Sequence, residues 1–304
     1  MCRNPEESFK LRLKMRYTKD WKDYELLDCS GGERLERWGK VILIRPDPQV
    51  IWNTPKEHSM WKHADARYVR SSAGGGHWEF RRELPEFWKI NYKDLTFKIS
   101  PTGFKHTGLF PEQAVNWDMM REKIKAAKEE GREVRVLNLF AYTGGATLAA
   151  ASAGASVCHV DAAKGMVHWA RENSELSALN EKPVRWIIDD CKKFVEREIR
   201  RGSRYDAVIL DPPSYGRGPG GEIWKLEEHI YELIELITGV LSEDPLFILL
   251  NSYTTGLSAS TMAYVLGANM NKFGGKVTAE EIGLPVTQSG MVLPCGSSAI
   301  WMKE

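Results

Sequence analysis

From about residue 112 onward, short apolar segments alternate with longer segments of helical periodicity. The apolar segments are VRVLNLF (134–140), ASVCHVD (155–161), VRWIID (184–189), YDAVILD (205–211) and PLFILLNSY (245–253). This alternation is typical of βαβ units, in which helices cover both faces of a parallel sheet. Two more strand candidates, at 276–284 and 297–303, follow a predicted helix near 257–272. We therefore predict an α/β fold with a doubly wound, Rossmann-like sheet of about seven mainly parallel strands.

The first hundred residues have a different pattern. Short β-type runs occur at 24–28, 40–46, 49–52 and 95–99, separated by segments rich in Gly, Pro, Asn and Asp. Such clusters of turn-forming residues break strands rather than helices. We predict a small β-rich N-terminal domain over residues 1–100 and an α/β domain over residues 101–304.

Charge is unevenly distributed between these two parts. Residues 1–110 contain 21 of the 42 lysines and arginines but only 15 of the 41 aspartates and glutamates. Basic residues interleaved with aromatic ones can hold phosphates and stack on bases, so the N-terminal part is a candidate for docking a nucleic-acid substrate. A solvated face on a small β domain that only caps its neighbour is the alternative.

Several classes of protein are disfavoured by composition. No segment approaches 18 uncharged apolar residues, and the first residues lack the apolar core of a signal peptide, so we expect a cytoplasmic protein. The five cysteines form no C-x-x-C pair and the seven histidines no H-E-x-x-H pattern. Neither a disulfide framework nor a metal site is therefore predicted.

Polar residues stand at the carboxyl ends of the predicted strands. The turn Phe140-Ala141-Tyr142-Thr143-Gly144 follows the first strand, Asp161 ends the second, Asp189 and Asp190 end the third, and Asp211 ends the fourth. Ligands of doubly wound sheets bind in the crevice beyond these ends. Taken singly, each residue also has a plain structural interpretation, such as Thr143 or an aspartate capping the helix that follows.

Taken together, these residues suit an adenosine that carries no pyrophosphate. Gly144 and Gly145 lack the G-x-G-x-x-G spacing of a pyrophosphate cradle. Asp161 is placed to accept the hydroxyls of a ribose. One of Asp189 and Asp190 could accept the adenine amino group while the other caps the next helix, and we favour Asp190 for adenine. S-adenosylmethionine is therefore favoured over a nicotinamide dinucleotide.

These motifs resemble those of class I S-adenosylmethionine-dependent methyltransferases, in the branch that contains the bacterial large-subunit ribosomal RNA base methyltransferases. The resemblance rests on LNLFAYTGG (137–145), Asp161, the pair Asp189-Asp190 and DPPSYGRG (211–218), and it spans residues 102 to about 255. Upstream, TGFKHTGLFPEQ (102–113) is similar to the family segment K-T-G-F-x-x-D-Q, with Lys105, Thr107, Gly108 and Gln113 in place. It departs from that pattern in an inserted His106 and in Glu112, which replaces the aspartate.

The resemblance implies an enzyme that uses S-adenosylmethionine and methylates RNA, with ribosomal RNA as the expected partner. It implies that Phe140, Ala141, Tyr142, Thr143 and Gly144 surround the methionine part of the cofactor, that Asp161 holds the ribose and Asp190 the adenine, and that Asp189, Lys105, Thr107 and Gln113 complete the cofactor site. Asp211, Pro212 and Pro213 would lie beside the methyl group, where proline leaves backbone carbonyls free for the substrate. Tyr215 would stack on a flipped or unpaired base.

The residue after the fifth strand bears on the atom that is methylated. Methylation of cytosine at C5 needs a cysteine that adds to the ring. In the cytosine-modifying relatives that cysteine follows the fifth strand, whereas this chain has Thr254 there. A nitrogen acceptor has, or readily exposes, a lone pair and needs no covalent help, so we predict a nitrogen.

Three alternatives stay open from the sequence. One is cytosine C5 methylation by analogy with the family. The others belong to different classes: a nicotinamide-dependent dehydrogenase, which would share the sheet and the ribose acid, and a non-catalytic RNA-binding protein that retains the fold. The glycine-rich loop at 216–221 is predicted to be a mobile basic lid over the site, and an exposed loop without a functional role is the alternative.

Overall fold

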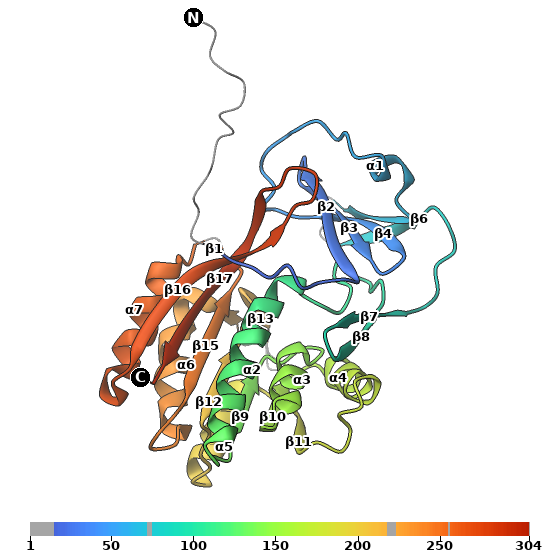
Figure 1. Ribbon diagram of the computed structural model, residues 1–304. Coiled ribbons are helices and arrows are strands. Elements are labelled where there is room, and N and C mark those ends of the chain that lie inside the picture. Colours follow the sequence, from blue (N-terminus) through green and yellow to red (C-terminus); the bar gives the residue numbers. More distant parts are fainter. Residues whose placement is uncertain (1–14, 72–74, 218–222, 255, 304) are drawn as a thin grey trace, which may run out of the picture.

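The chain forms a large mixed sheet covered by helices on both faces, with a second, smaller β structure at one end (Figure 1). The computed structural model describes residues 15–71, 75–217, 223–254 and 256–303. The large sheet has eight strands in the order β1-β16-β17-β15-β12-β9-β10-β11. Their bounds are β1 Met15–Arg16, β9 Arg135–Leu139, β10 Ser156–Asp161, β11 Val184–Ile188, β12 Ala207–Leu210, β15 Phe247–Ser252, β16 Lys276–Pro285 and β17 Val292–Met302. Strand β17 runs antiparallel to both of its neighbours, and the other pairs are parallel.

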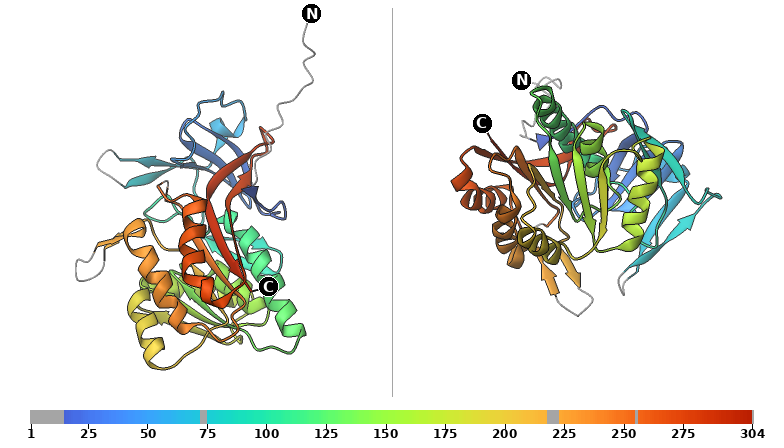
Figure 2. Two further views of the ribbon diagram at one scale, coloured as in Figure 1. Left: turned by 90° about the vertical axis from the view of Figure 1, so that its left-hand side faces the viewer. Right: turned by 90° about the horizontal axis from the view of Figure 1, so that it is seen from below.

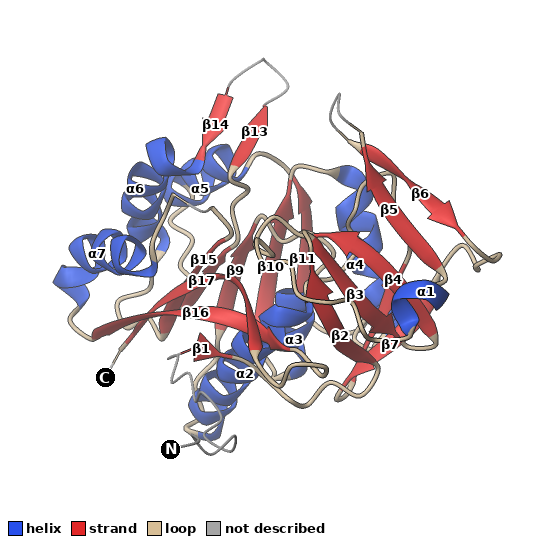
Figure 3. Ribbon diagram, turned by 90° about the horizontal axis from the view of Figure 1, so that it is seen from above, coloured by secondary structure: helices blue, strands red, loops and turns tan. Residues whose placement is uncertain are grey.

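Helices cover both faces because alternate residues of each strand point to opposite sides. Val136 of β9 belongs to the hydrophobic cluster that includes α2 (Ala114–Glu129) and α3 (Gly145–Ser152). The next residue, Leu137, belongs to the cluster that includes α5 (Cys191–Arg200), α6 (Leu226–Ile237) and α7 (Ala259–Met270). Figures 2 and 3 show these two helical layers on either side of the sheet. Helix α4 (Lys164–Leu176) packs against β10 and β11.

The N-terminal part contains a five-stranded sheet and a hairpin. The sheet is formed by β2 (Tyr24–Ser30), β3 (Glu33–Trp38), β4 (Val41–Pro46), β5 (Ala66–Arg70) and β6 (Gly76–Phe80), in that order. The short helix α1 (Met60–His63) lies between β4 and β5 in the chain, and β7 (Trp88–Tyr92) pairs with β8 (Leu95–Ile99) as a hairpin.

The two parts of the chain are packed together. Trp38 of β3 and Trp117 of α2 lie in one buried hydrophobic cluster. The turn between β16 and β17 reaches the N-terminal sheet, where the backbone N–H of Thr287 donates to the carbonyl of Leu26 at 2.9 Å (Figure 1). The division into two domains at residue 100 therefore stays a prediction.

The predicted α/β class is confirmed, and each of the seven predicted strands is found. The two-residue strand β1, which has no sequence signal, adds an eighth. The run at 49–52 was expected to be extended but forms no strand, because Asp47 turns the chain there by accepting the backbone N–H of Gln49 through its side chain at 2.9 Å. In the described part of the chain, no helix combines the length and apolarity needed to cross a membrane.

Candidate functional site

A cavity lies at the carboxyl ends of β9, β12 and β15, where ligands of such sheets bind. Its volume is about 50 Å³, so a ligand larger than a few waters must extend beyond it. The polar and aromatic residues that line it include Phe110, Gln113, Asn138, Phe140, Tyr142, Thr143, Asp211 and Asn251. Several residues predicted from separate motifs thus meet in one place.

The turn after β9 has an unusual backbone. Phe140 and Tyr142 have φ of 55° and 51°, and Gly144 has φ of 88°. Residues other than glycine rarely occupy this left-handed region, so the surrounding structure must hold the turn in place. The backbone N–H of Phe140 donates to the Cys191 sulfur at 3.3 Å, and that of Tyr142 to the Asp161 carboxylate at 2.8 Å.

Asp161 ends β10 and contacts the turn after β9. One carboxylate oxygen accepts the N–H of Tyr142 and the other that of Ala163, both at 2.8 Å. Burial nevertheless raises the pKa of Asp161 above its ordinary value. Ile188, its partner in strand register, is 51% exposed. A carboxylate beside an exposed apolar side chain offers both surfaces that a nucleoside needs, hydrogen-bond acceptors for the sugar and an apolar face for the base.

Asp189 and Asp190 follow β11, and their contacts differ from those that we expected. Asp190 is the N-cap of α5, where its side chain accepts the backbone N–H of Lys193 at 2.9 Å. Asp189 forms an ion pair with Arg197 and accepts the N–H of Asp190 at 2.9 Å. The capping role thus falls to the residue that we favoured for adenine. A contact of Asp190 with adenine stays a prediction, because a carboxylate has further lone pairs.

The segment 102–113 is docked onto the turn after β9. The Thr143 hydroxyl donates to the carbonyl of Gly108 at 2.5 Å, so it does not cap α3, whose N-cap is Gly144. A side chain at Gly108 would come within 2.3 Å of the Trp169 ring, and its φ of 96° also favours glycine.

The three cofactor-site residues predicted in this segment lie in different surroundings. Gln113 lines the cavity and donates to the Tyr253 hydroxyl at 2.7 Å. Thr107 is fully buried, and its hydroxyl has no hydrogen-bond partner within the described residues. The Lys105 carbonyl accepts from Arg45 of the N-terminal sheet at 3.1 Å, and burial lowers the pKa of the Lys105 amine to about 8. Neither Thr107 nor Lys105 lines the cavity.

Asp211 follows β12 and faces the cavity. Burial, and then the nearby Glu112 carboxylate, raise the pKa of Asp211 to about 7. Glu112 is itself 2% exposed, and one of its carboxylate oxygens has no hydrogen-bond partner in the part of the chain that the structure describes. A carboxyl group that titrates near neutrality can accept or release a proton there, as acid–base chemistry requires.

The two prolines after Asp211 differ in what their carbonyls can do. The Trp224 indole N–H donates to the carbonyl of Pro213 at 2.7 Å. The Pro213 carbonyl therefore already has one partner, a residue from beyond the glycine-rich loop. Its contact with a substrate stays a prediction, because a carbonyl has a second lone pair. The Trp224 ring lies 5.7 Å from that of Phe140, so it joins the Pro-Pro turn to the turn after β9.

Tyr215 and Thr254 lie close to the Pro-Pro turn in the chain or in space. Tyr215 begins β13 (Tyr215–Arg217), which pairs with β14 (Ile223–Lys225), and is 51% exposed. The Thr254 hydroxyl donates to the Ser214 hydroxyl at 2.6 Å, which places the threonine beside the Pro-Pro turn. The predicted lid at 216–221 lies largely outside the described residues.

Sequence reasoning missed Ile188 and Trp224. A half-exposed apolar residue at a strand end is the only signal that Ile188 offers, and its exposure is not visible in the sequence. Trp224 is separated from Pro213 by the glycine-rich loop, so only the pairing of β13 with β14 brings the two together. Among the described residues, no group of three His, Cys, Asp or Glu side chains could hold a metal ion.

An α/β sheet with acidic residues at its strand ends and a strained turn after its first central strand is typical of nucleotide-binding proteins of the Rossmann-like class. The model of the S-adenosylmethionine-dependent methyltransferase family matches residues 52–237. The chain belongs to this family, and S-adenosylmethionine is its cofactor. The acceptors and the apolar face around Asp161 fit the adenosine part of that molecule.

Solved structures agree with this assignment. The crystal structure of the methyltransferase from Agrobacterium tumefaciens is 35% identical, with a TM-score of 0.89 over 95% of this chain and 93% of that chain. A methyltransferase structure complexed with S-adenosylhomocysteine has a TM-score of 0.73 at 19% identity, over 93% of this chain and 76% of that chain, and so supports the fold alone.

The curated relatives are named for ribosomal RNA. Ribosomal RNA large subunit methyltransferase K/L of Shewanella sp. (strain MR-4) is 36% identical over 121 residues, which are 39% of this chain and 16% of the relative. The protein of the same name from Pseudoalteromonas atlantica is 37% identical over 170 residues, 55% of this chain and 22% of the relative. The matched segments thus span only about a fifth of these relatives.

Proposed function

We propose that this enzyme methylates a nitrogen of an RNA base, with ribosomal RNA as the expected substrate and the cytoplasm as the expected place of action. The names of the curated relatives support the choice of RNA. The observation that carries the choice of nitrogen is the position of Thr254, whose hydroxyl is hydrogen-bonded to Ser214 beside the Pro-Pro turn. A cysteine nucleophile would be needed there for carbon methylation.

The cysteines of the described residues support the same choice. Cys29, Cys158, Cys191 and Cys295 are all buried, and burial raises the pKa of each thiol above its ordinary value. A thiol with a raised pKa forms little of the thiolate that adds to a pyrimidine ring. A nitrogen acceptor avoids this requirement.

In this proposal, the residues of the protein orient the base and stabilise the charge that develops on it. Bound S-adenosylmethionine supplies a methyl group that is already activated for displacement. The Asp211 carboxylate and the Pro212 carbonyl accept N–H groups of the base and orient its nitrogen, and Tyr215 stacks on the ring. Asp211 stabilises the positive charge that develops on the nitrogen and can take the proton it loses. Orientation alone can contribute about 7 to 11 kcal/mol to lowering the barrier.

The proposal is tested by transfer of labelled methyl groups to RNA, followed by nucleoside analysis. Unmodified ribosomal RNA transcripts serve as the substrate, and the Asp211→Asn variant serves as the control for background. We expect a base methylated on nitrogen as the product. 5-Methylcytidine as the sole product would overturn the assignment to nitrogen, and label in protein or small molecules but not in RNA would overturn the assignment to RNA.

Replacing Glu112 with Gln is expected to move the pH dependence of methyl transfer to lower pH. The Glu112 charge raises the pKa of Asp211, so its removal lowers that pKa. Activity that needs the ionised Asp211 rises with pH through about 7 in the native enzyme and should rise at a lower pH in the variant. Rates measured from pH 5 to 9 give the midpoint. The exposed Glu122→Gln is the control, and an unchanged or higher midpoint for Glu112→Gln would contradict the coupling.

A further inference from the structure

A second cleft, of about 520 Å³, lies in the N-terminal part and shares no lining residue with the cavity at the strand ends. Its walls come from the turn between β3 and β4, the segment between β6 and β7, and the start of β7. The lining residues are Asp23, Gly39, Lys40, Val41, Arg82, Pro85, Trp88 and Lys89. Neither the proposed chemistry nor the predicted cofactor contacts use any of them.

The cleft carries a net positive charge. Three of its residues are cationic, and its one carboxylate, that of Asp23, already accepts the backbone and side-chain N–H groups of Asn91 at 2.8 Å each. Arg82 is ion-paired with Asp65. Lys40 and Lys89 are exposed and form no ion pair with any residue that the structure describes. Two amines are therefore available to an anionic ligand.

The same cleft is also lined by an aromatic side chain. Trp88 is partly exposed and lines the cleft. Gly39, with φ of 66°, brings the β3–β4 turn close to that ring, since a side chain at Gly39 would lie 3.9 Å from Cδ1 of Trp88. Cations and an aromatic ring in one cleft match a nucleotide, whose phosphates need positive charge and whose base stacks on a ring. A purely acidic peptide would not use the ring.

The cleft is fixed relative to the crevice at the strand ends. The hairpin of β7 and β8 is attached to α4, where the backbone N–H of Lys98 donates to the Asn173 side chain at 2.8 Å. The same side chain donates to the carbonyl of Thr143 at 2.9 Å. Asn173 is fully buried, so one side chain ties the cleft wall to the turn after β9. A chain held in the cleft thus has a defined geometry relative to the site of methylation.

We infer that this cleft binds a nucleotide of single-stranded RNA outside the methylated one, with phosphates on Lys40 and Lys89 and a base on Trp88. The inference rests on the proposed function, because it assigns a second contact to the same RNA substrate. It gives the N-terminal part a role in substrate docking beyond covering the catalytic part.

The test compares binding of a fluorescently labelled single-stranded oligoribonucleotide to the native protein and to the double variant Lys40→Gln/Lys89→Gln. We expect the affinity at low salt to fall about tenfold. The slope of log Kd against log salt concentration should fall by about 1.4, since each lost phosphate contact on a single strand contributes about 0.7. Trp88→Leu should lower the affinity without changing the salt slope, because stacking releases no counterions.

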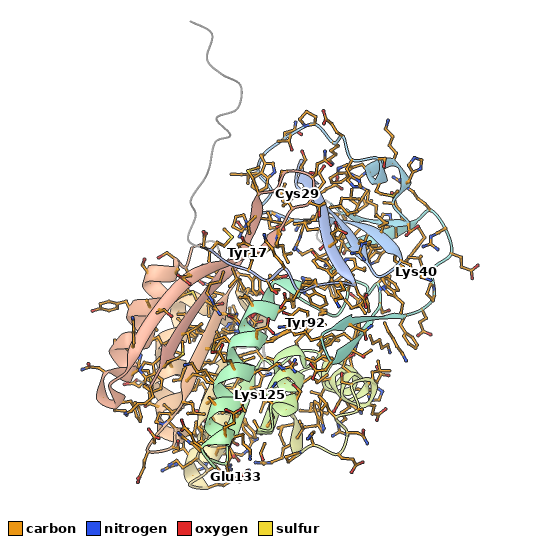
Figure 4. All side chains as sticks on the ribbon, viewed as in Figure 1. Tyr17, Cys29, Lys40, Tyr92, Lys125 and Glu133 are labelled. Carbon is orange, nitrogen blue, oxygen red and sulfur yellow. The ribbon has the colours of Figure 1, made fainter. Side chains whose placement is uncertain are left out.

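The matched control is Lys123→Gln/Lys125→Gln, which removes the same charge from the exposed face of α2. Figure 4 labels Lys40 in the N-terminal part and Lys125 on α2. Equal RNA affinities of the cleft and control variants would overturn the inference, whether both match the native protein or both are weakened. If the native protein binds and methylates no RNA, the proposed function fails instead. Affinity for S-adenosylmethionine should not change in any of these variants, and a change would show that the cleft residues act through the fold.

Discussion

Asp211→Asn is expected to slow methyl transfer by about 10²- to 10³-fold while leaving the affinity for S-adenosylmethionine nearly unchanged. The side chains are isosteric, but the amide carries no charge and cannot take a proton. Removing one preorganised group that stabilises a developing charge typically costs this much in rate. Single-turnover methyl transfer to RNA measures the chemical step, and calorimetric titration measures cofactor binding. A rate within a few-fold of the native enzyme would contradict the role given to Asp211.

The same variant should be more stable than the native protein above neutral pH. The pKa of Asp211 is raised from 3.8 to about 7 in the folded protein, so the folded state binds more protons than the unfolded state between these pH values. Native stability therefore falls as pH rises through this window, and asparagine removes that loss. We expect a gain of about 1 to 3 kcal/mol in the free energy of unfolding at pH 8, and none near pH 3. Higher stability with lower activity would exclude misfolding as the cause of the rate loss.

Asp161→Ala is expected to weaken S-adenosylmethionine binding by about 1 to 3 kcal/mol, or roughly 5- to 150-fold in Kd. The carboxylate is predicted to accept the ribose hydroxyls, and it also orders the turn after β9 through the N–H of Tyr142. The variant loses both contributions, and each loss lowers the affinity for S-adenosylmethionine.

A matched control separates this loss from a general effect of removing an acidic residue. Asp244→Ala removes an exposed carboxylate that precedes β15 and is ion-paired with Arg132, at the opposite end of the sheet from the crevice. Its Kd should equal that of the native protein, and a native-like Kd for Asp161→Ala would contradict the ribose contact. Thermal unfolding of both variants without cofactor shows how much stability each has lost.

The catalytic half of the fold could be predicted from sequence because its central strands are buried on both faces. Strands such as Phe247–Ser252 contain only residues that the sheet buries, so their signal does not depend on partners elsewhere. The N-terminal sheet was harder to predict. Strand Glu33–Trp38 has the sequence ERLERW, which suggests an exposed segment. In the fold Glu36 is buried because Arg45 of the next strand donates to it at 2.6 and 2.8 Å, and no local pattern shows that pairing.

Some features of the candidate site could likewise be predicted from the sequence, and others could not. The acids at the strand ends could be placed from sequence because parallel strands bring their carboxyl ends to one edge. The contacts between distant segments could not be placed. Trp224 occupying the carbonyl of Pro213, and Thr254 meeting Ser214, depend on loops that fold back over the crevice. Glu112 aligned with a family position by sequence, but its effect on Asp211 follows only from burial.

A crystal structure of this protein with bound S-adenosylhomocysteine tests the central claim most directly. The account predicts an adenosine at the ends of β10 and β11, with its ribose on Asp161 and its base beside Ile188, and a sulfur that faces the crevice next to Asp211. Adenosine bound elsewhere in the chain, or a sulfur turned away from Asp211 and Pro212, would contradict it.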